Sequence, residues 1–136
     1  DVVELVPAVI AWARGPIVEI FGGSLDDVRV RLIEDDVSDV IRARPGAYDA
    51  ILLDVDNGPD GLTRPANDAI YTSRGLAEAK AALRPGGVLA IWCQGAHAGL
   101  WADLQALSAS AREERHVVQR GRHRIAYVIY TVRADR

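Results

Sequence analysis

Short runs of apolar residues alternate with amphipathic stretches along most of the chain. An uninterrupted apolar run of roughly four to eight residues is typical of a strand buried on both faces, and an apolar stripe with a period near 3.6 is typical of a crossover helix. The predicted parallel strands are residues 2–6, 29–33, 48–53 and 88–93. The predicted helices are residues 7–13, 17–21, 39–44, 68–83 and 97–111. This alternation predicts an α/β protein with a doubly wound, mostly parallel sheet.

Two further strands are predicted near the end of the chain, at residues 116–119 and 125–132. A glycine between charged residues marks a tight turn, so these strands are expected to form an antiparallel hairpin. A parallel sheet that ends in such a hairpin is a feature of the class I methyltransferase-like Rossmann fold. The turn Arg120-Gly121-Arg122-His123-Arg124 could bind phosphate, but its apolar flanks favour a solvated turn.

Composition narrows the class of protein. The 136 residues, 49% of them apolar and 26% charged, predict one globular domain over residues 1–136. The net charge of −3 gives no indication of a nucleic-acid or membrane partner. No membrane span or signal peptide is evident, and we expect a cytoplasmic protein. Cys93 lies in an apolar run and is expected to be a buried, inert thiol. The three histidines have no metal-ligand spacing, so no metal is expected.

Acidic residues recur where the predicted strands end. They are Glu4 in the first strand, Asp35 and Asp36 after the second, and Asp54 and Asp56 after the third. The carboxyl ends of parallel strands form the ligand-binding edge of an open α/β sheet, so these carboxylates are expected to line one rim. Carboxylates placed there can accept hydrogen bonds from ribose hydroxyls and from an adenine amino group. A structural interpretation also stands, because Asp often caps a helix or turns the chain after a strand.

The beginning of the chain has an unusual pattern. A nucleotide site on this fold normally starts with a strand and a glycine-rich turn, and no such turn follows Glu4. The sequence also starts at Asp1 and contains no methionine. We therefore expect the first βα unit of the fold to be missing, with its strand belonging between the strands at 2–6 and 48–53. Glu4 would then be the acid that follows the glycine motif by about twenty residues.

Five segments, in their order and spacing, resemble the catalytic domain of the spermidine synthases, which are polyamine aminopropyltransferases. The segments are Val3-Glu4-Leu5-Val6-Pro7, Asp27-Val28-Arg29-Val30 leading into Asp36, Tyr48-Asp49-Ala50-Ile51-Leu52-Leu53-Asp54, Ala69-Ile70-Tyr71 and Leu83-Arg84-Pro85-Gly86-Gly87-Val88-Leu89. The resemblance covers residues 2–94. Its last segment is shared with many methyltransferases and supports the fold alone. The first and third segments together are more specific to the family.

This resemblance implies transfer of an aminopropyl group from decarboxylated S-adenosylmethionine to a diamine such as putrescine. It implies that Glu4 binds the ribose and that Asp36, with the backbone of Val37, holds the adenine. Asp54 would be the catalytic acid–base residue. The adenosyl compound is a co-substrate, so no tightly bound cofactor is expected, and the partners implied are a small-molecule amine and a second copy of the chain in a homodimer. The residues implied to bind the amine are Asp56 and Tyr71.

The chain departs from the family around the predicted amine site. Its segment Asp54-Val55-Asp56-Asn57-Gly58-Pro59 is two residues shorter than the family's, in which Asp-Ser-Ser-Asp-Pro precedes Gly-Pro. Asp56 matches the second carboxylate only after a shift in register, and without a gap that position is Asn57. The family's extended segment after residue 94 and its N-terminal β domain have no counterpart here.

Two other functions stay open at the level of sequence. One is a methyltransferase-fold protein that uses S-adenosylmethionine itself on another substrate, with Asp54 in a positioning role. The other is a non-catalytic relative that keeps the fold for association. A glycine-rich loop upstream of Glu4 would support either enzyme, and a small β domain before it would favour the aminopropyltransferase.

Overall fold

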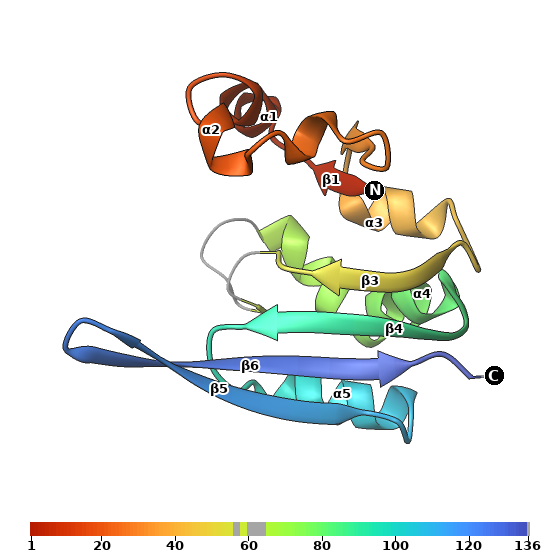
Figure 1. Ribbon diagram of the computed structural model, residues 1–136. Helices are drawn as coiled ribbons and strands as arrows, with labels where there is room; N and C mark the ends of the chain where they lie inside the picture. The colour runs from red at the N-terminus through yellow and green to blue at the C-terminus, as the bar shows by residue number, and fades with distance from the viewer. Residues whose placement is uncertain (56–57, 60–64, 136) are drawn as a thin grey trace. The chain divides into compact units, whose positions relative to one another are not determined.

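The computed structural model describes residues 1–55, 58–59 and 65–135, without the side chains of residues 65–67. Two compact units make up the chain, Asp1–Ala43 and Arg44–Arg136 (Figure 1). The strands of the first unit form a two-stranded sheet, and those of the second form a separate four-stranded sheet.

The first unit is a small β–helix–β–helix arrangement. Its elements are β1 (Val2–Glu4), α1 (Pro7–Arg14), α2 (Val18–Phe21), the 3-10 helix η1 (Ser24–Asp26), β2 (Leu32–Glu34) and α3 (Val37–Arg42). Pro7 opens α1, where its missing N–H costs no hydrogen bond. β1 and β2 pair in parallel, with Val2 opposite Leu32 and Glu4 opposite Glu34. The two strands therefore end at the same edge.

Two boundaries in this unit differ from the prediction. β2 begins at Leu32 rather than Arg29. Asp27 folds the preceding residues into a turn, because its carboxylate accepts from the Arg29 amide at 2.9 Å and pairs with the Arg29 guanidinium at 2.7 Å. The helix predicted at 39–44 spans Val37–Arg42, because the Asp36 side chain caps it from its first turn.

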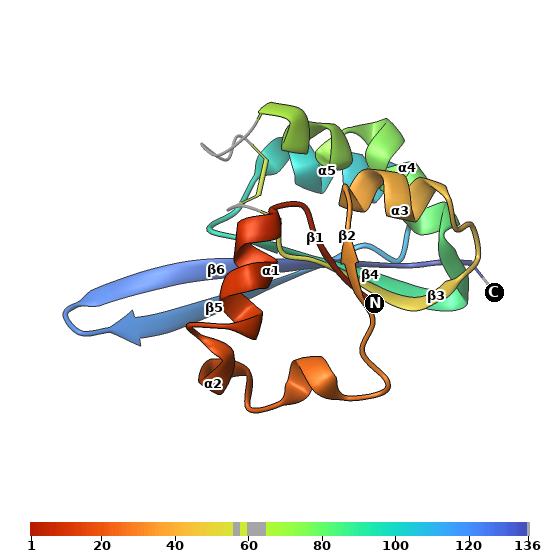
Figure 2. The ribbon, with the colours of Figure 1, turned by 90° about the horizontal axis from the view of Figure 1, so that it is seen from above.

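The second unit is a mixed sheet with helices on one face. Its elements are β3 (Tyr48–Leu53), the 3-10 helix η2 (Pro65–Tyr71), α4 (Ser73–Ala81), β4 (Leu83–Cys93), α5 (Ala98–Leu107), β5 (Arg112–Arg120) and β6 (His123–Arg133). The strand order is β3-β4-β6-β5. β3 and β4 are parallel, and β6 is antiparallel to both of its neighbours. Figure 2 shows α4 and α5 side by side on the same face of this sheet.

The core of the second unit lies between that face and the two helices. Every second residue is buried from Gly87 to Cys93 in β4 and from Val128 to Val132 in β6, as alternation in a sheet covered on one face requires. The largest fully buried side chains are Tyr130, Leu76, Leu89, Ile91, Leu100, Leu104, Val128, Val132 and Cys93. Among the residues described in both units, no helix is long and apolar enough to span a membrane.

The helix predicted at 68–83 is divided. Residues 65–71 form the 3-10 helix, and α4 starts at Ser73 because Thr72 caps it, with its hydroxyl accepting from the Gly75 amide at 3.2 Å. The strand predicted at 88–93 is in regular register with β3 from Val88 onward. The extended segment before it, from Leu83, contains Gly86 at φ +79° and a register shift against β3.

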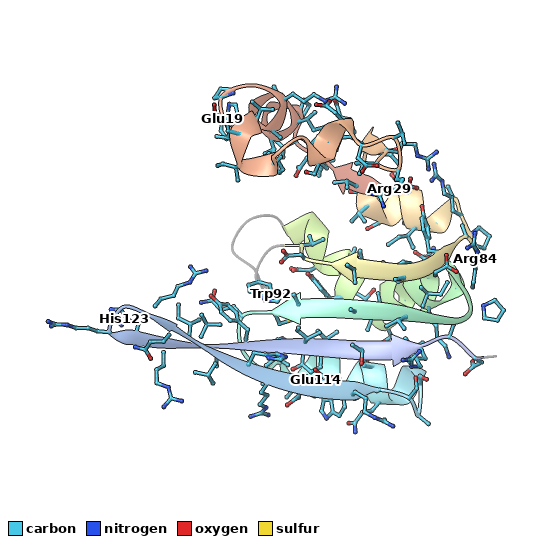
Figure 3. The ribbon with its side chains drawn as sticks, in the orientation of Figure 1. Glu19, Arg29, Arg84, Trp92, Glu114 and His123 are labelled. Atoms are coloured by element: carbon cyan, nitrogen blue, oxygen red, sulfur yellow. The ribbon has the colours of Figure 1, made fainter. Side chains whose placement is uncertain are left out.

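The C-terminal hairpin is antiparallel, as predicted, but longer at both ends. Its turn contains Gly121 at φ +60°, and His123 lies at the exposed tip (Figure 3). β4 ends at Cys93, which pairs with Val128, so the residues of β6 before Val128 pair with β5 alone. The hairpin therefore extends past the carboxyl end of β4. The helix predicted at 97–111 ends at Leu107, where Ser108 starts a turn by accepting from the Ser110 amide at 3.2 Å.

Candidate functional site

Two of the predicted acidic strand ends share one edge of the first sheet. Glu4 ends β1 opposite Glu34, and the amide of Asp35 donates to the Glu4 carbonyl at 3.3 Å. The Glu4 carboxylate accepts from the Val6 amide at 2.8 Å, which turns the chain out of the strand. Asp36 follows at the same edge. The acids at the ends of β1 and β2 therefore lie at one edge of this sheet.

Asp36 has a structural role in addition to any binding role. Its carboxylate accepts from the Ser38 amide at 2.8 Å and caps α3, while its own amide donates to the Asp35 side chain at 2.8 Å. Val37 is the first residue of α3, and the N–H groups of the first helical turn have no partner within a helix. A carboxylate offers about four acceptor positions, so a capping Asp can still accept from a ligand.

Asp54 follows the last residue of β3 in the second unit and is exposed. The helix α4 that comes later in the chain is capped by Thr72, so Asp54 does not serve as its cap. Asp56 lies outside the described residues. Tyr71, at the end of η2, is buried, and its hydroxyl donates to the carbonyl oxygen of Val55, the residue next to Asp54.

A contact that the sequence did not predict lies at the end of β4, which Trp92 marks in Figure 3. Gly58 is buried and has φ +102°, and a Cβ added to it would lie 2.8 Å from the Sγ atom of Cys93. Cys93 is 2% exposed, and burial raises the pKa of its thiol to about 11. The predicted burial of this thiol is confirmed. No local pattern could have revealed this contact, because the two residues are distant in the sequence and meet only through β3–β4 pairing.

The segment after β4 is also held by specific hydrogen bonds. The Tyr130 hydroxyl accepts from the His97 amide at 2.9 Å, and the His97 Nδ1 atom accepts from the Leu100 amide at 3.0 Å. His97 therefore caps α5 and does not lie within it. Across the described parts of the chain, no group of three His, Cys, Asp or Glu residues could hold a metal ion.

Within its first unit, the structure places Glu4 and Asp36 at one edge of the sheet, and within its second unit it brings Tyr71 together with the backbone beside Asp54. The convergence of Glu4, Asp36 and Asp54 on one nucleoside pocket stays a prediction. The binding roles of Val37 and Tyr71 likewise stay predictions.

Comparison with known proteins gives no matching family model. The polyamine aminopropyltransferase of Mycobacterium tuberculosis is 36% identical to this chain over 92 residues, which are 65% of this chain and 17% of that protein. The polyamine aminopropyltransferase of Korarchaeum cryptofilum is 31% identical over 120 residues, 85% of this chain and 35% of that protein. The chain thus spans a sixth to about a third of the length of these curated relatives.

Solved structures show the same fold. A spermidine synthase in complex with the transition state analogue AdoDATO has a TM-score of 0.76 and 15% identity over 95% of this chain and 45% of its own. Spermidine synthase from Thermotoga maritima has a TM-score of 0.71 and 16% identity over 95% of this chain and 44% of its own. Human methyltransferase-like protein 13, solved with SAH, has a TM-score of 0.60 and 25% identity over 93% of this chain and 58% of its own.

The class I methyltransferase-like fold predicted from the strand–helix alternation and the terminal hairpin is confirmed by these structures. The predicted family is confirmed by the curated relatives. The chain is a homologue of the polyamine aminopropyltransferases, the family of the spermidine synthases.

Proposed function

We propose that the protein transfers an aminopropyl group from decarboxylated S-adenosylmethionine to a small amine. The observation that carries this proposal is the exposed carboxylate of Asp54, placed directly after a parallel strand in a chain homologous to aminopropyltransferases. Carboxyl ends of parallel strands are where α/β proteins bind their ligands. The relatives are polyamine aminopropyltransferases, which supports the reaction class, and the diamine putrescine is the acceptor that we propose.

The first unit supports a nucleoside site. Glu4 and Asp36 lie at one sheet edge, and each is half-buried with one backbone hydrogen bond already accepted. Their remaining lone pairs can accept from ribose hydroxyls, for Glu4, and from the adenine amino group, for Asp36. The amide of Val37, in the first turn of α3, can donate to a ring nitrogen of the adenine.

Asp54 is suited to the proton transfer that this reaction needs. The acceptor amine is an ammonium ion at neutral pH and must lose a proton before its nitrogen can attack the carbon bonded to the sulfonium. A carboxylate beside it attracts the cation and takes the proton as the C–N bond forms and the C–S bond breaks. The sulfur leaves as a neutral thioether, 5′-methylthioadenosine, so no acid is needed to assist the leaving group. Asp56 is the proposed amine-binding residue, and Tyr71 is the second residue that the resemblance to spermidine synthases assigns to the amine.

Methyl transfer from S-adenosylmethionine is the second candidate. It is favoured by the solved methyltransferases that share this fold, one of which holds SAH. Structural likeness at this level of identity does not separate the two reactions, whereas the curated sequence relatives favour aminopropyl transfer. The two reactions differ in their products, which makes them easy to distinguish by mass spectrometry. The cytoplasmic location and the homodimer stay predictions from the sequence.

The test is turnover of the intact natural protein with decarboxylated S-adenosylmethionine and putrescine, compared with Asp54→Asn. The variant keeps the shape of the side chain but cannot take a proton, so turnover should fall by about 10²–10⁴-fold, with nucleoside affinity unchanged.

A matched control is Asp49→Asn. Asp49 lies on the same strand and is exposed, but its carboxylate pairs with Arg84 at 2.6 Å. Exposed ion pairs contribute little to the stability of a protein, so Asp49→Asn should fold normally and keep full turnover. Full turnover in Asp54→Asn would remove Asp54 from the chemistry. Transfer of a methyl group instead of an aminopropyl group would establish the second candidate.

A further inference from the structure

The backbone beside Asp54 is held by a buried side chain. Asp54 itself is exposed, so packing around its own side chain does not fix where its carboxylate lies. Val55 follows it directly, and the Val55 carbonyl accepts a hydrogen bond from the Tyr71 hydroxyl. Tyr71 is only 5% exposed, which keeps this hydrogen bond away from competing water. Its phenol therefore fixes the peptide on which the position of Asp54 depends.

A second contact holds the same segment a few residues later. Gly58 is buried and lies against Cys93, the last residue of β4, so closely that even a methyl group at position 58 would overlap the Sγ atom. Cys93 is in turn packed into the sheet at 2% exposure. The described residues after β3 are thus attached to the protein at two points, Val55 through Tyr71 and Gly58 through Cys93.

We propose that Tyr71 is a positioning residue that, together with the contact of Gly58 with Cys93, fixes the carboxylate of Asp54 at the end of β3. The effect of this positioning on turnover rests on the proposed aminopropyl transfer. The resemblance to spermidine synthases implies that Tyr71 touches the amine. The buried ring and the hydroxyl's donation to Val55 support an indirect role instead.

Cys93 gives a direct readout of this attachment, because it is the only thiol in the chain and lies beneath Gly58. A thiol reagent reaches this buried thiol only when the structure around it opens, so the labelling rate at fixed pH reports an opening equilibrium to which the segment with Gly58 contributes. Tyr71→Phe removes only the hydroxyl. Losing a hydrogen bond of ordinary net strength should accelerate labelling by about 2- to 10-fold.

Tyr48→Phe is the matched control. Tyr48 starts β3, and its hydroxyl accepts from Arg44 at 3.3 Å, at the opposite end of the strand. Labelling of Cys93 should be unchanged in this variant. The free energy of unfolding in urea, measured for both variants, shows whether faster labelling follows local opening or a general loss of stability. Acceleration confined to Tyr71→Phe supports the proposal. Equal rates in the two variants, or acceleration that merely follows global stability, would overturn it.

Steady-state kinetics with decarboxylated S-adenosylmethionine and putrescine form the second arm. A displaced Asp54 should lower kcat about 10-fold in Tyr71→Phe and leave the KM of the adenosyl substrate unchanged. A rise in the KM of putrescine alone would place Tyr71 in contact with the amine and refute the positioning role. If the unmutated protein has no turnover, the proposed function fails, while the labelling rates still decide whether Tyr71 holds this segment.

Discussion

The substitution Gly58→Ala tests the packing between Gly58 and the end of β4. The added Cβ would lie 2.8 Å from the Cys93 Sγ atom, 3.2 Å from its Cβ and 3.7 Å from its Cα. Nonbonded carbon and sulfur atoms do not approach to 2.8 Å, and the sulfur is held in the sheet, so one of the two segments must move. Gly58 also has φ +102°, a backbone conformation that a residue with a Cβ adopts only under strain.

These two effects can be given separate magnitudes. Backbone strain at a positive φ costs about 1–2 kcal/mol for an alanine. Overpacking a buried contact costs about 1–3 kcal/mol. Gly58→Ala should therefore lower the free energy of unfolding by about 2–5 kcal/mol. Adding Cys93→Ala removes the sulfur and with it the worst overlap, whereas the strain remains. The double variant should be more stable than the sum of the single variants predicts by about 1–3 kcal/mol.

Urea unfolding, followed by tryptophan fluorescence and far-UV circular dichroism, measures all four proteins of this cycle. Gly86→Ala is the control for strain alone, because Gly86 has φ +79° and nothing within 4 Å of the added Cβ. Gly86→Ala should therefore lower the free energy of unfolding by about 1–2 kcal/mol, through backbone strain alone. Additive effects of the two substitutions, or a cost for Gly58→Ala no larger than for Gly86→Ala, would refute the close contact between Gly58 and Cys93.

Two further predictions concern titration and capping. Burial raises the pKa of Cys93 from 9.0 to about 11, so the folded state holds the thiol proton more tightly than the unfolded state. The raised pKa contributes at most about 3 kcal/mol to the free energy of unfolding. This contribution is fully present below pH 9 and is lost as the pH rises through about 11. Urea unfolding measured between pH 9 and about pH 11 should show a smaller loss in the free energy of unfolding for Cys93→Ala than for the unmutated chain. Equal losses in the two proteins would contradict the raised pKa of Cys93. Asp36→Ala should lower the free energy of unfolding by about 1 kcal/mol through loss of the α3 cap, whereas Asp36→Asn should nearly preserve it. Equal losses in the two variants, measured by urea unfolding, would show that the cap contributes nothing.

The sequence predicted those parts of the fold that depend on local pattern. β3 spans Tyr48–Leu53, the range predicted for it, and it ends where Asp54 ends the apolar run. The start of β2 could not be predicted in the same way. Arg29, Val30 and Arg31 alternate as a strand should, but Asp27 bonds to Arg29 and forms a turn instead. A side chain that competes for a nearby amide has no signature in hydrophobic periodicity.

Only part of the candidate site could be predicted from the sequence. Strand-end carboxylates are visible in sequence because they follow apolar runs, and Glu4 and Asp36 do share an edge. The hydroxyl of Tyr71 on the Val55 carbonyl and the contact of Gly58 with Cys93 are tertiary. They depend on how η2 and β4 pack against the end of β3. Motif resemblance assigned Tyr71 to the amine and gave no indication of these contacts.

The charge pattern of β5 has a consequence for solubility. β5 is the outermost strand of its sheet, and the backbone groups along such an edge can pair with a strand of another molecule. Its sequence from Arg112 to His116 is entirely charged or ionisable, with Arg115 paired to Glu113 at 2.6 Å. A second chain that added here would have to desolvate or displace these charges. At the β5 edge of the sheet, these charges therefore oppose edge-to-edge aggregation.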